Sequence, residues 1–304
     1  MLKWYEVKEQ AAGRKRLMLL WYIYKIAGRR PVKFIVFFVT FFAFLGAPGI
    51  RKCSQKFQKI ISGNGGIIQA FRHFLSYAYS LVDTMEMYTN KFGIQNIYFA
   101  NEDDKKVLFK DFKAKNGICF LCSHLGNINA MRVFFKSGTE IDGINVNMFL
   151  EVNQCKIFKD FLASITPDDP INVYPVEGID LTTSIDLKEK LDNGEIVFIA
   201  GDRISAHNPN SVFPLKFFGH NTYFPLGAFK LSLVMDVPIY FIACTKDEKG
   251  MYAIHVKKFE LSGKRSQMLE QLKEQYVEVL EKLVKKYPLQ FYHFYDFFCD
   301  KIDL

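Results

Sequence analysis

The sequence predicts an α/β protein in which helices flank a mixed β-sheet, with a helical region in front of it. From residue 117 onward, short apolar runs of strand length alternate with amphipathic segments of helix length. Before residue 100, apolar residues instead recur at helical spacing or in longer runs. We therefore divide the chain into a helical region, residues 1–100, and an α/β domain, residues 101–304.

Composition narrows the class of protein. Of the 304 residues, 49% are hydrophobic and 24% are charged, which excludes global disorder. Lys and Arg number 40 against 32 Asp and Glu, a net charge of +8 that suits an anionic membrane surface or an acidic partner protein. A nucleic-acid binder is the less favoured alternative, because the basic residues form no single stripe and no recognisable nucleic-acid module.

Two apolar runs in the helical region, residues 17–24 and 34–47, are flanked by cations. The first is short, lacks a small-residue cleavage pattern and precedes further cations, which disfavours a signal peptide. The second is uncharged only over 34–50, at the low end of the roughly 17–25 residues that span a bilayer. We expect helices that lie in or dip into one leaflet, with Arg and Lys at the headgroups. A buried core helix and a single span are the alternatives.

Residues 51–100 have apolar positions at helical spacing, among them Phe71 and Phe74. His73 stands beside these two and is expected to be a packed histidine rather than a ligand. The polar stretch 101–106 is expected to be a solvated turn before a short helix that ends at Ala114.

The α/β domain is expected to alternate strands with helices. Apolar runs predict strands or extended segments at 118–122, 144–150, 172–176, 196–200, 213–218, 239–245 and 252–260. Amphipathic or apolar segments of helix length lie at 128–135, 154–165, 184–191, 226–235 and 266–286. Asp247 to Gly250 is a hairpin signal between the last two strands.

The cysteines and most histidines carry no signal for a metal. Cys119 and Cys122 form a C-x-x-C pattern inside an apolar strand, with no second pair at metal-ligand spacing, so inert buried thiols are favoured. The usage of six cysteines suits a reducing compartment. His207, His220 and His255 show no metal-ligand spacing, and no feature requires a metal or cofactor.

His124 has the strongest chemical context in the chain. The apolar run 118–122 ends at Ser123 and His124, and Gly126 with Asn127 opens an amphipathic segment. This pattern places an imidazole at the rim of a sheet, near the backbone N–H groups of a helix N-terminus, which favour negative charge. Such an arrangement is suited to chemistry.

The stretch from His124 to Arg132 resembles the acyltransferase motif of the lysophospholipid acyltransferase-like superfamily, in the branch of the late lipid A acyltransferases. The matching positions are His124, Leu125, Gly126, Asn127, Ala130 and Arg132, while Asn129 stands where the family has Glu or Asp. Further blocks that resemble the family in the same order are 200–203, 217–219, 223–227, 237–239 and 287–298. Trp4 with Glu6, residues 28–31, and Arg51 with Ser54 look closest to acyltransferases that accompany aryl-polyene lipid synthesis.

The resemblance implies a glycerolipid acyltransferase-like fold and a membrane-associated enzyme of lipid biosynthesis. Such an enzyme moves an acyl group from an acyl carrier protein or coenzyme A thioester to the hydroxyl of a lipid or glycolipid. It implies a peripheral or monotopic protein on the cytoplasmic face of a bacterial inner membrane. His124 would be the general base and Asn129 a neutral residue that orients the imidazole. No cofactor is implied beyond the acyl donor.

Asn129 leaves several alternatives open. On a continuous helix an offset of five residues turns by about 140°, so the two side chains meet only if His124 precedes the helix. An amide oxygen can hold the tautomer but cannot stabilise the imidazolium by charge. Another carboxylate, Glu151 or Asp202, could reach His124, or the reaction could tolerate the loss. Otherwise the chain is a catalytically impaired, lipid-binding member of the same fold.

The remaining site candidates each carry a functional and a structural interpretation. Arg203 would hold a phosphate of the donor or acceptor, or would pair structurally with Asp202. Gly219 and Gly227 would let the backbone approach the ligand, or would serve turns. Gly126, Asn127, Asp202 and Pro225 complete the predicted substrate-binding set with Arg132, which could face solvent or a headgroup. For the aromatic segment 291–298, core packing is favoured over an acyl-chain groove.

Overall fold

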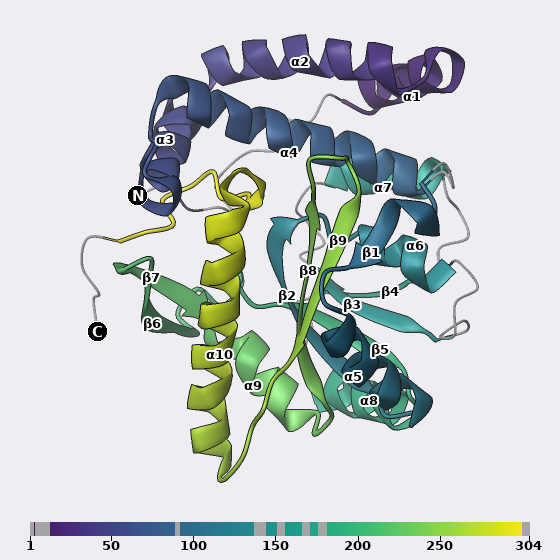
Figure 1. The fold of residues 1–304 in the computed structure, drawn as a ribbon, viewed down its shortest axis with the longest axis vertical. Helices are drawn as coiled ribbons and strands as arrows, with labels where there is room; N and C mark the ends of the chain where they lie inside the picture. Colours follow the sequence, from purple (N-terminus) through teal and green to yellow (C-terminus); the bar gives the residue numbers. More distant parts are fainter. Residues whose placement is uncertain are drawn as a thin grey trace. The chain divides into compact units, whose positions relative to one another are not determined.

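A computed structural model describes Lys3 and residues 13–88, 92–136, 144–150, 156–165, 171–175 and 181–299. The chain forms two compact units, which are described separately (Figure 1). The helical unit comprises residues 1–92, 152–169 and 287–298, and the sheet unit comprises residues 93–151, 170–286 and 299–304. Trp4 and Glu6, part of the resemblance, lie outside the described residues.

The helical unit takes its helices from three parts of the chain. Its elements are α1 (Arg14–Ala27), α2 (Arg29–Gly46), α3 (Pro48–Ser62), α4 (Ile67–Tyr88), α7 (Lys156–Ile165) and the 3₁₀ turn η4 (Pro288–Gln290). Gly28 separates α1 from α2 with a φ of 78°, a conformation that glycine adopts without strain. Trp21, Tyr24, Met85 and Phe161 form one buried core that draws on α1, α4 and α7.

A buried ionic cluster lies beside this core. Arg29 pairs with Asp83, and its Nη1 lies 2.7 Å from Oε2 of Glu86. Both carboxylates come from α4 and are almost fully buried. Burial of such carboxylates is costly unless a cation compensates them, so this cluster holds the start of α2 against α4.

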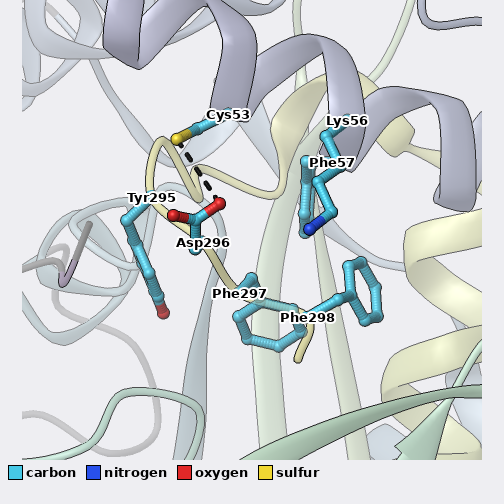
Figure 2. Close-up of a pocket in the computed structure, with 7 residues that line it drawn as sticks. All are labelled: Cys53, Lys56, Phe57, Tyr295, Asp296, Phe297 and Phe298. Carbon is cyan, nitrogen blue, oxygen red and sulfur yellow. Dashed lines mark hydrogen bonds between the residues drawn. The ribbon is translucent and has the colours of Figure 1, made fainter. Parts of the chain in front are cut away.

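The C-terminal aromatic segment packs into the helical unit. Phe291, Phe297 and Phe298 are buried and contact the ring of Phe57. The prediction of core packing for 291–298 is therefore confirmed. Figure 2 shows the small pocket that this packing leaves, in which Sγ of Cys53 lies 3.8 Å from Oδ1 of Asp296.

None of the described helices is by itself long and apolar enough to cross a membrane. Helices α2 and α3 meet that criterion only when taken together, and they meet at a bend of 98°.

The sheet unit contains a mixed seven-stranded sheet of order β1-β9-β8-β2-β5-β3-β4 (Figure 1). The bounds of these strands are β1 (Ile97–Phe99), β2 (Ile118–Gly126), β3 (Val146–Leu150), β4 (Ile171–Pro175), β5 (Ile196–Ala200), β8 (Ile239–Lys246) and β9 (Tyr252–Lys258). Strands β8, β2, β5, β3 and β4 are parallel, whereas β9 runs antiparallel to β8 and pairs in parallel with β1. The predicted α/β class with a mixed sheet flanked by helices is confirmed.

The helices and the remaining strands of the sheet unit follow the same chain order. They are η2 (Ile94–Asn96), α5 (Glu102–Lys113), α6 (Ala130–Lys136), α8 (Leu181–Asp192), β6 (Val212–Phe217), β7 (His220–Pro225), α9 (Leu226–Val234) and α10 (Arg265–Lys286). Strands β6 and β7 form a separate antiparallel hairpin. Its turn places Phe218 and Gly219 at φ values of 52° and 73°, as a two-residue hairpin turn with matching twist requires.

Alternating side chains along the central strands bury both faces of the sheet. Phe120 and Tyr240 lie on the face whose aromatic contacts continue to Phe198 and Phe135 of α6. Phe241 lies on the other face, where its ring contacts Tyr276 of α10. Figure 1 shows α9 and α10 together on that side of the sheet. Burial of both faces explains why the central strands β2, β5 and β8 contain continuous apolar runs.

Two local expectations are wrong. The stretch 101–106 is not a turn, because Oδ1 of Asn101 accepts hydrogen bonds from the backbone N–H groups of Asp103 and Asp104 and caps α5. The acidic residues of its first turn also interact favourably with the helix dipole. The strand predicted to end at Cys122 continues to Gly126, and the helix after it begins at Ala130 rather than 128. This second difference determines where His124 lies.

Candidate active site

His124 lies in a bulge of β2. Strand β2 pairs with β8 through Cys122 and Ile242, and the pairing resumes at Gly126 and Cys244. Four steps along β2 therefore oppose two steps along β8. A bulge of this kind bends a strand out of its ladder and redirects a side chain. Here it releases Ser123, His124 and Leu125 from the regular pairing.

Gly126 closes the bulge because no other residue fits there. Its φ is 74°, and a Cβ at this position would lie 1.9 Å from the carbonyl oxygen of Cys244. The next residue, Asn127, donates its backbone N–H to the same carbonyl at 2.7 Å. Gly126 was predicted to bind substrate, but its surroundings explain it as the residue that lets β2 return to β8.

Asp202 arrives at His124 from the neighbouring strand. Strands β2 and β5 are paired from Ile118 with Ile196 to Cys122 with Ala200, so their paired parts end at the same edge of the sheet. Gly201 continues the pairing by donating its N–H to the carbonyl of Cys122 at 2.9 Å. Carboxyl ends of parallel strands are where ligands bind in open α/β sheets. The strand order also reverses at this point. Strand β3, which follows β2 in the chain, and strand β8, the next strand of this sheet after β5, lie on opposite sides of β2.

The carboxylate of Asp202 makes two hydrogen bonds to His124. Its Oδ1 lies 2.8 Å from Nδ1 of the ring, and its Oδ2 accepts the backbone N–H of His124 at 2.7 Å. A carboxylate only accepts hydrogen bonds, so Nδ1 carries the proton and Nε2 presents a lone pair. The side chain of Asp202 is fully buried, whereas that of His124 is 35% exposed. The pair therefore has the form of an oriented general base.

The pKa of His124 lies below its ordinary value of 6.5. Desolvation is the largest cause, and the positive charge of Arg203 acts in the same direction. The charge of Asp202 and its hydrogen bond to the ring oppose both effects. At neutral pH the imidazole is therefore neutral, which is the form that accepts a proton.

Asn129 does not take the orienting role that the sequence assigned to it. Its backbone N–H and its Nδ2 both donate to Oδ1 of Asn127, at 3.1 and 3.0 Å. Within the described parts of the chain, no hydrogen bond joins Asn129 to His124. The reason is the bulge: His124 lies in β2, and Asn129 lies in the turn before α6. Of the two alternative carboxylates, Asp202 makes the contact, and Glu151 lies outside the described residues.

The two arginines of the predicted site differ in their surroundings. Arg203 follows Asp202 directly, is partly buried and acts electrostatically on His124. Arg132 is only 4% exposed, so the expectation that it faces solvent or a headgroup is wrong. It lies in the first turn of α6, which packs against the sheet through Phe135.

The other predicted substrate-binding residues belong to the β6–β7 hairpin and the start of α9. Gly219 is exposed in the hairpin turn, Pro225 is buried as the last residue of β7, and Gly227 is exposed in the first turn of α9. Gly219 is explained by its positive φ, so turn chemistry accounts for it. A Cβ at Gly227 would meet open space, so packing does not require glycine there.

The buried thiols of β2 fit a structural role. Cys119 and Cys122 are buried free thiols, and burial raises the pKa of Cys119 to about 12 and that of Cys122 further. Such thiols are inert. Among the residues with described positions, no group of three His, Cys, Asp or Glu side chains could hold a metal ion.

The sequence identified the histidine and named Asp202 only as one alternative partner. The signal for the pairing is indirect: both residues follow apolar runs of strand length, and neighbouring parallel strands end at one edge. Comparison with protein-family models and with curated proteins finds no match. The interpretation of this site therefore rests on its own chemistry.

Proposed function

We propose that this chain is an acyltransferase that moves an acyl group from a thioester to a hydroxyl, with His124 as the general base. The observation that carries the proposal is the 2.8 Å contact between Nδ1 of His124 and the buried carboxylate of Asp202. Because Nδ1 carries a proton, Nε2 is the ring nitrogen that removes one from the substrate, and the carboxylate stabilises the imidazolium that results. The imidazolium then has a charged partner, which favours the enzyme over an impaired lipid-binding protein.

The chemistry of each step follows from this pair. Nε2 takes the proton of the acceptor hydroxyl as its oxygen attacks the thioester carbonyl, forming a C–O bond. The tetrahedral intermediate collapses with cleavage of the C–S bond, and the imidazolium returns the proton to the leaving thiolate. The products are an ester and a free thiol. A neutral imidazole at neutral pH is required, in accord with the lowered pKa of His124.

Arg203 is proposed to contact an anionic group of the substrates. Its guanidinium lies near enough to His124 to lower the pKa of the imidazole. A planar guanidinium binds phosphate with two hydrogen bonds, and both coenzyme A and the phosphopantetheine of an acyl carrier protein carry phosphate. The net charge of +8 also favours acidic carrier proteins and anionic lipids.

Membrane association is proposed from the helical unit. The face of α2 opposite its buried residues exposes Phe34 (65%), Phe42 (66%) and Leu45 (51%), an arrangement that a water-exposed helix seldom carries. No charged residue lies between Phe34 and Ile50, and cations stand at both ends of that stretch. This combination fits a helix lying at a bilayer interface with Arg and Lys at the headgroups.

We propose that the enzyme meets its lipid or glycolipid acceptor at the bilayer to which the exposed face of α2 binds. The resemblance to the late lipid A acyltransferase branch, and to the acyltransferases of aryl-polyene lipid synthesis, supports the same class of acceptor. It also supports the cytoplasmic face of a bacterial inner membrane as the location. The fold proposed on this basis is glycerolipid acyltransferase-like.

Release of free thiol tests the proposed reaction. The full-length chain is incubated with a long-chain acyl-CoA or acyl carrier protein thioester and with vesicles that contain the acceptor lipid. We expect His124→Ala to lower the rate by roughly 10²–10⁴-fold, the usual contribution of a general base. His207→Ala is the matched control, because His207 is an exposed loop histidine of the same unit. Equal rates in wild type and His124→Ala would refute the assignment, and vesicle binding without any thioester turnover would favour the lipid-binding alternative.

Sedimentation with vesicles tests the membrane surface separately. We expect the triple variant Phe34→Ala, Phe38→Ala and Phe42→Ala to bind vesicles of mixed zwitterionic and anionic lipid more weakly, by at least roughly tenfold, because each buried Phe contributes about 1.5–3 kcal/mol. Val234→Ala removes an exposed apolar side chain from the sheet unit and serves as control. Unchanged binding by the triple variant would refute this surface.

A further inference from the structure

Tyr276 of α10 contacts the end of the strand that carries His124. Its side chain is fully buried, and its hydroxyl donates a hydrogen bond to the carbonyl oxygen of Cys122 at 2.9 Å. The same carbonyl accepts the N–H of Gly201, also at 2.9 Å. Cys122 is the last paired residue before the bulge of β2, and Gly201 directly precedes Asp202. One carbonyl therefore joins β2, β5 and α10 beside the bulge.

The position of the Tyr276 ring is closely defined by its neighbours. Its centroid lies 5.2 Å from that of Phe229, 5.5 Å from Phe241 and 6.0 Å from Phe224. A Cβ on Gly201 would lie 3.0 Å from its Cζ, so glycine leaves the space that the phenol needs. Burial and the nearby charge of Asp202 raise the pKa of Tyr276 well above its ordinary value, and the hydroxyl therefore stays a donor.

We propose that Tyr276 is a positioning residue for the pair formed by His124 and Asp202. A carbonyl oxygen has two lone pairs, and here one donor comes from β5 and one from α10. The ladder between β2 and β8 pairs both ends of the bulge, at Cys122 and Gly126, but it does not pair the residues between them. The two donors on Cys122 hold the start of the bulge beside the strand that delivers Asp202. This inference rests on the proposed function, because it concerns the same histidine.

Tyr276→Phe removes only the hydroxyl and keeps the packed ring. Tyr240→Phe is the matched control, since Tyr240 is also fully buried and its hydroxyl donates to Oδ2 of Asp111 at 2.5 Å. Each variant removes the hydrogen bond that its hydroxyl donates, but the hydroxyl of Tyr240 contacts Asp111 of α5 and not Cys122 at the bulge. The readout is the ¹⁵N NMR spectrum of the histidine rings, with His124 assigned from His124→Ala.

We expect Tyr276→Phe to shift the ¹⁵N signals of His124. We also expect the midpoint of the His124 titration to fall, because the charge and hydrogen bond of Asp202 favour the protonated ring and a looser contact weakens both. We expect kcat to fall roughly tenfold with KM little changed, since the loss concerns orientation rather than binding. Tyr240→Phe should leave the His124 spectrum, kcat and KM unchanged. If Tyr276→Phe gave the wild-type His124 spectrum and titration, Tyr276 would be a core residue only.

A second variant reaches the same contact without removing the hydroxyl. In Gly201→Ala the new Cβ would press on Tyr276 Cζ and, at 3.1 Å, on Cδ1 of Leu121, and so displace the phenol. We expect the same direction of change in the His124 signals; an unchanged spectrum would overturn the proposal even if Tyr276→Phe failed to fold. The two proposals can fail separately. If the variants shift the His124 signals but the wild-type protein consumes no thioester, the positioning role of Tyr276 is supported and the acyltransferase activity is refuted.

Discussion

His73 of the helical unit and His124 of the sheet unit both have a hydrogen bond at Nδ1, and they differ in almost everything else. Nδ1 of His73 lies 2.9 Å from the hydroxyl of Ser54, and its Nε2 lies 3.1 Å from the carbonyl oxygen of Phe291. The ring is fully buried and stacks on Phe294 at 4.3 Å. His124 instead contacts a buried carboxylate, and 35% of its side chain is exposed.

The difference shows what separates a structural histidine from one suited to proton transfer. Neutral partners occupy both ring nitrogens of His73, and burial lowers its pKa to about 3, so it stays uncharged and inaccessible. The carboxylate beside His124 compensates the charge that the ring acquires when it takes a proton. Aromatic neighbours in the sequence indicated the first kind of histidine, and the end of an apolar strand indicated the second.

The largest effect is expected from Asp202→Asn. An amide in place of the carboxylate removes the charge that stabilises the imidazolium and can hold the ring in the wrong tautomer. We expect kcat to fall by roughly 10⁴-fold, as when the charged partner of a catalytic histidine is neutralised in serine proteases. Thiol release measures the rate, and circular dichroism checks that the variant is folded. A loss of less than about tenfold would show that the carboxylate of Asp202 does not assist His124.

Acid should destabilise the helical unit through His73. The folded-state pKa of about 3 lies below the ordinary value of 6.5, so between these values the unfolded chain binds a proton that the folded chain does not. Stability is therefore fully present above pH 6.5 and falls by about 1.4 kcal/mol for each unit as the pH drops toward 3. Denaturant titrations followed by tryptophan fluorescence report on this unit through Trp21, which is buried in its core.

His73→Gln should flatten that slope even if it lowers stability at neutral pH. His207→Gln, a change in an exposed histidine, should leave the slope as in wild type. An equal acid slope in wild type and His73→Gln would contradict the buried, neutral state of His73.

The smallest effect is expected from Asn129→Glu. This substitution restores the carboxylate that the resembling family carries, but the hydrogen-bond partner of Nδ1 is already Asp202. We expect the rate of thiol release to stay within about threefold of wild type. A gain of tenfold or more would show that the reaction needs a carboxylate at position 129 and that Asp202 does not supply this function to His124.

The sequence predicts those parts of the fold that depend on local pattern. The run 196–200 has the same bounds in the sequence and in β5, because a short uncharged segment buried on both faces has few alternatives. The bulge of β2 was missed because Ser123 and His124 are polar, and polarity is an ordinary sign that a strand ends. Strand β7 was missed as well, since its pairing with β6 depends on the positive φ values of Phe218 and Gly219.

The partner of His124 could not be fixed from sequence for a different reason. Asp202 lies 78 positions from His124, and the two meet only because β2 and β5 are neighbours in the sheet. Asn129 is close in sequence, and the motif directs attention to it, but its position depends on whether His124 lies in a strand or in a turn. Strand order is a property of the whole chain, so no local pattern reveals it.

The dependence of kcat/KM for thiol release on pH tests the central claim most directly, because it reports the ionisation of the free enzyme's essential base. The account predicts that kcat/KM is constant around neutral pH and falls at lower pH with a midpoint below 6.5, the ordinary value for histidine, as His124 becomes protonated. A midpoint at or above 6.5, or a rate that shows no titration in this range, would contradict His124 as the base.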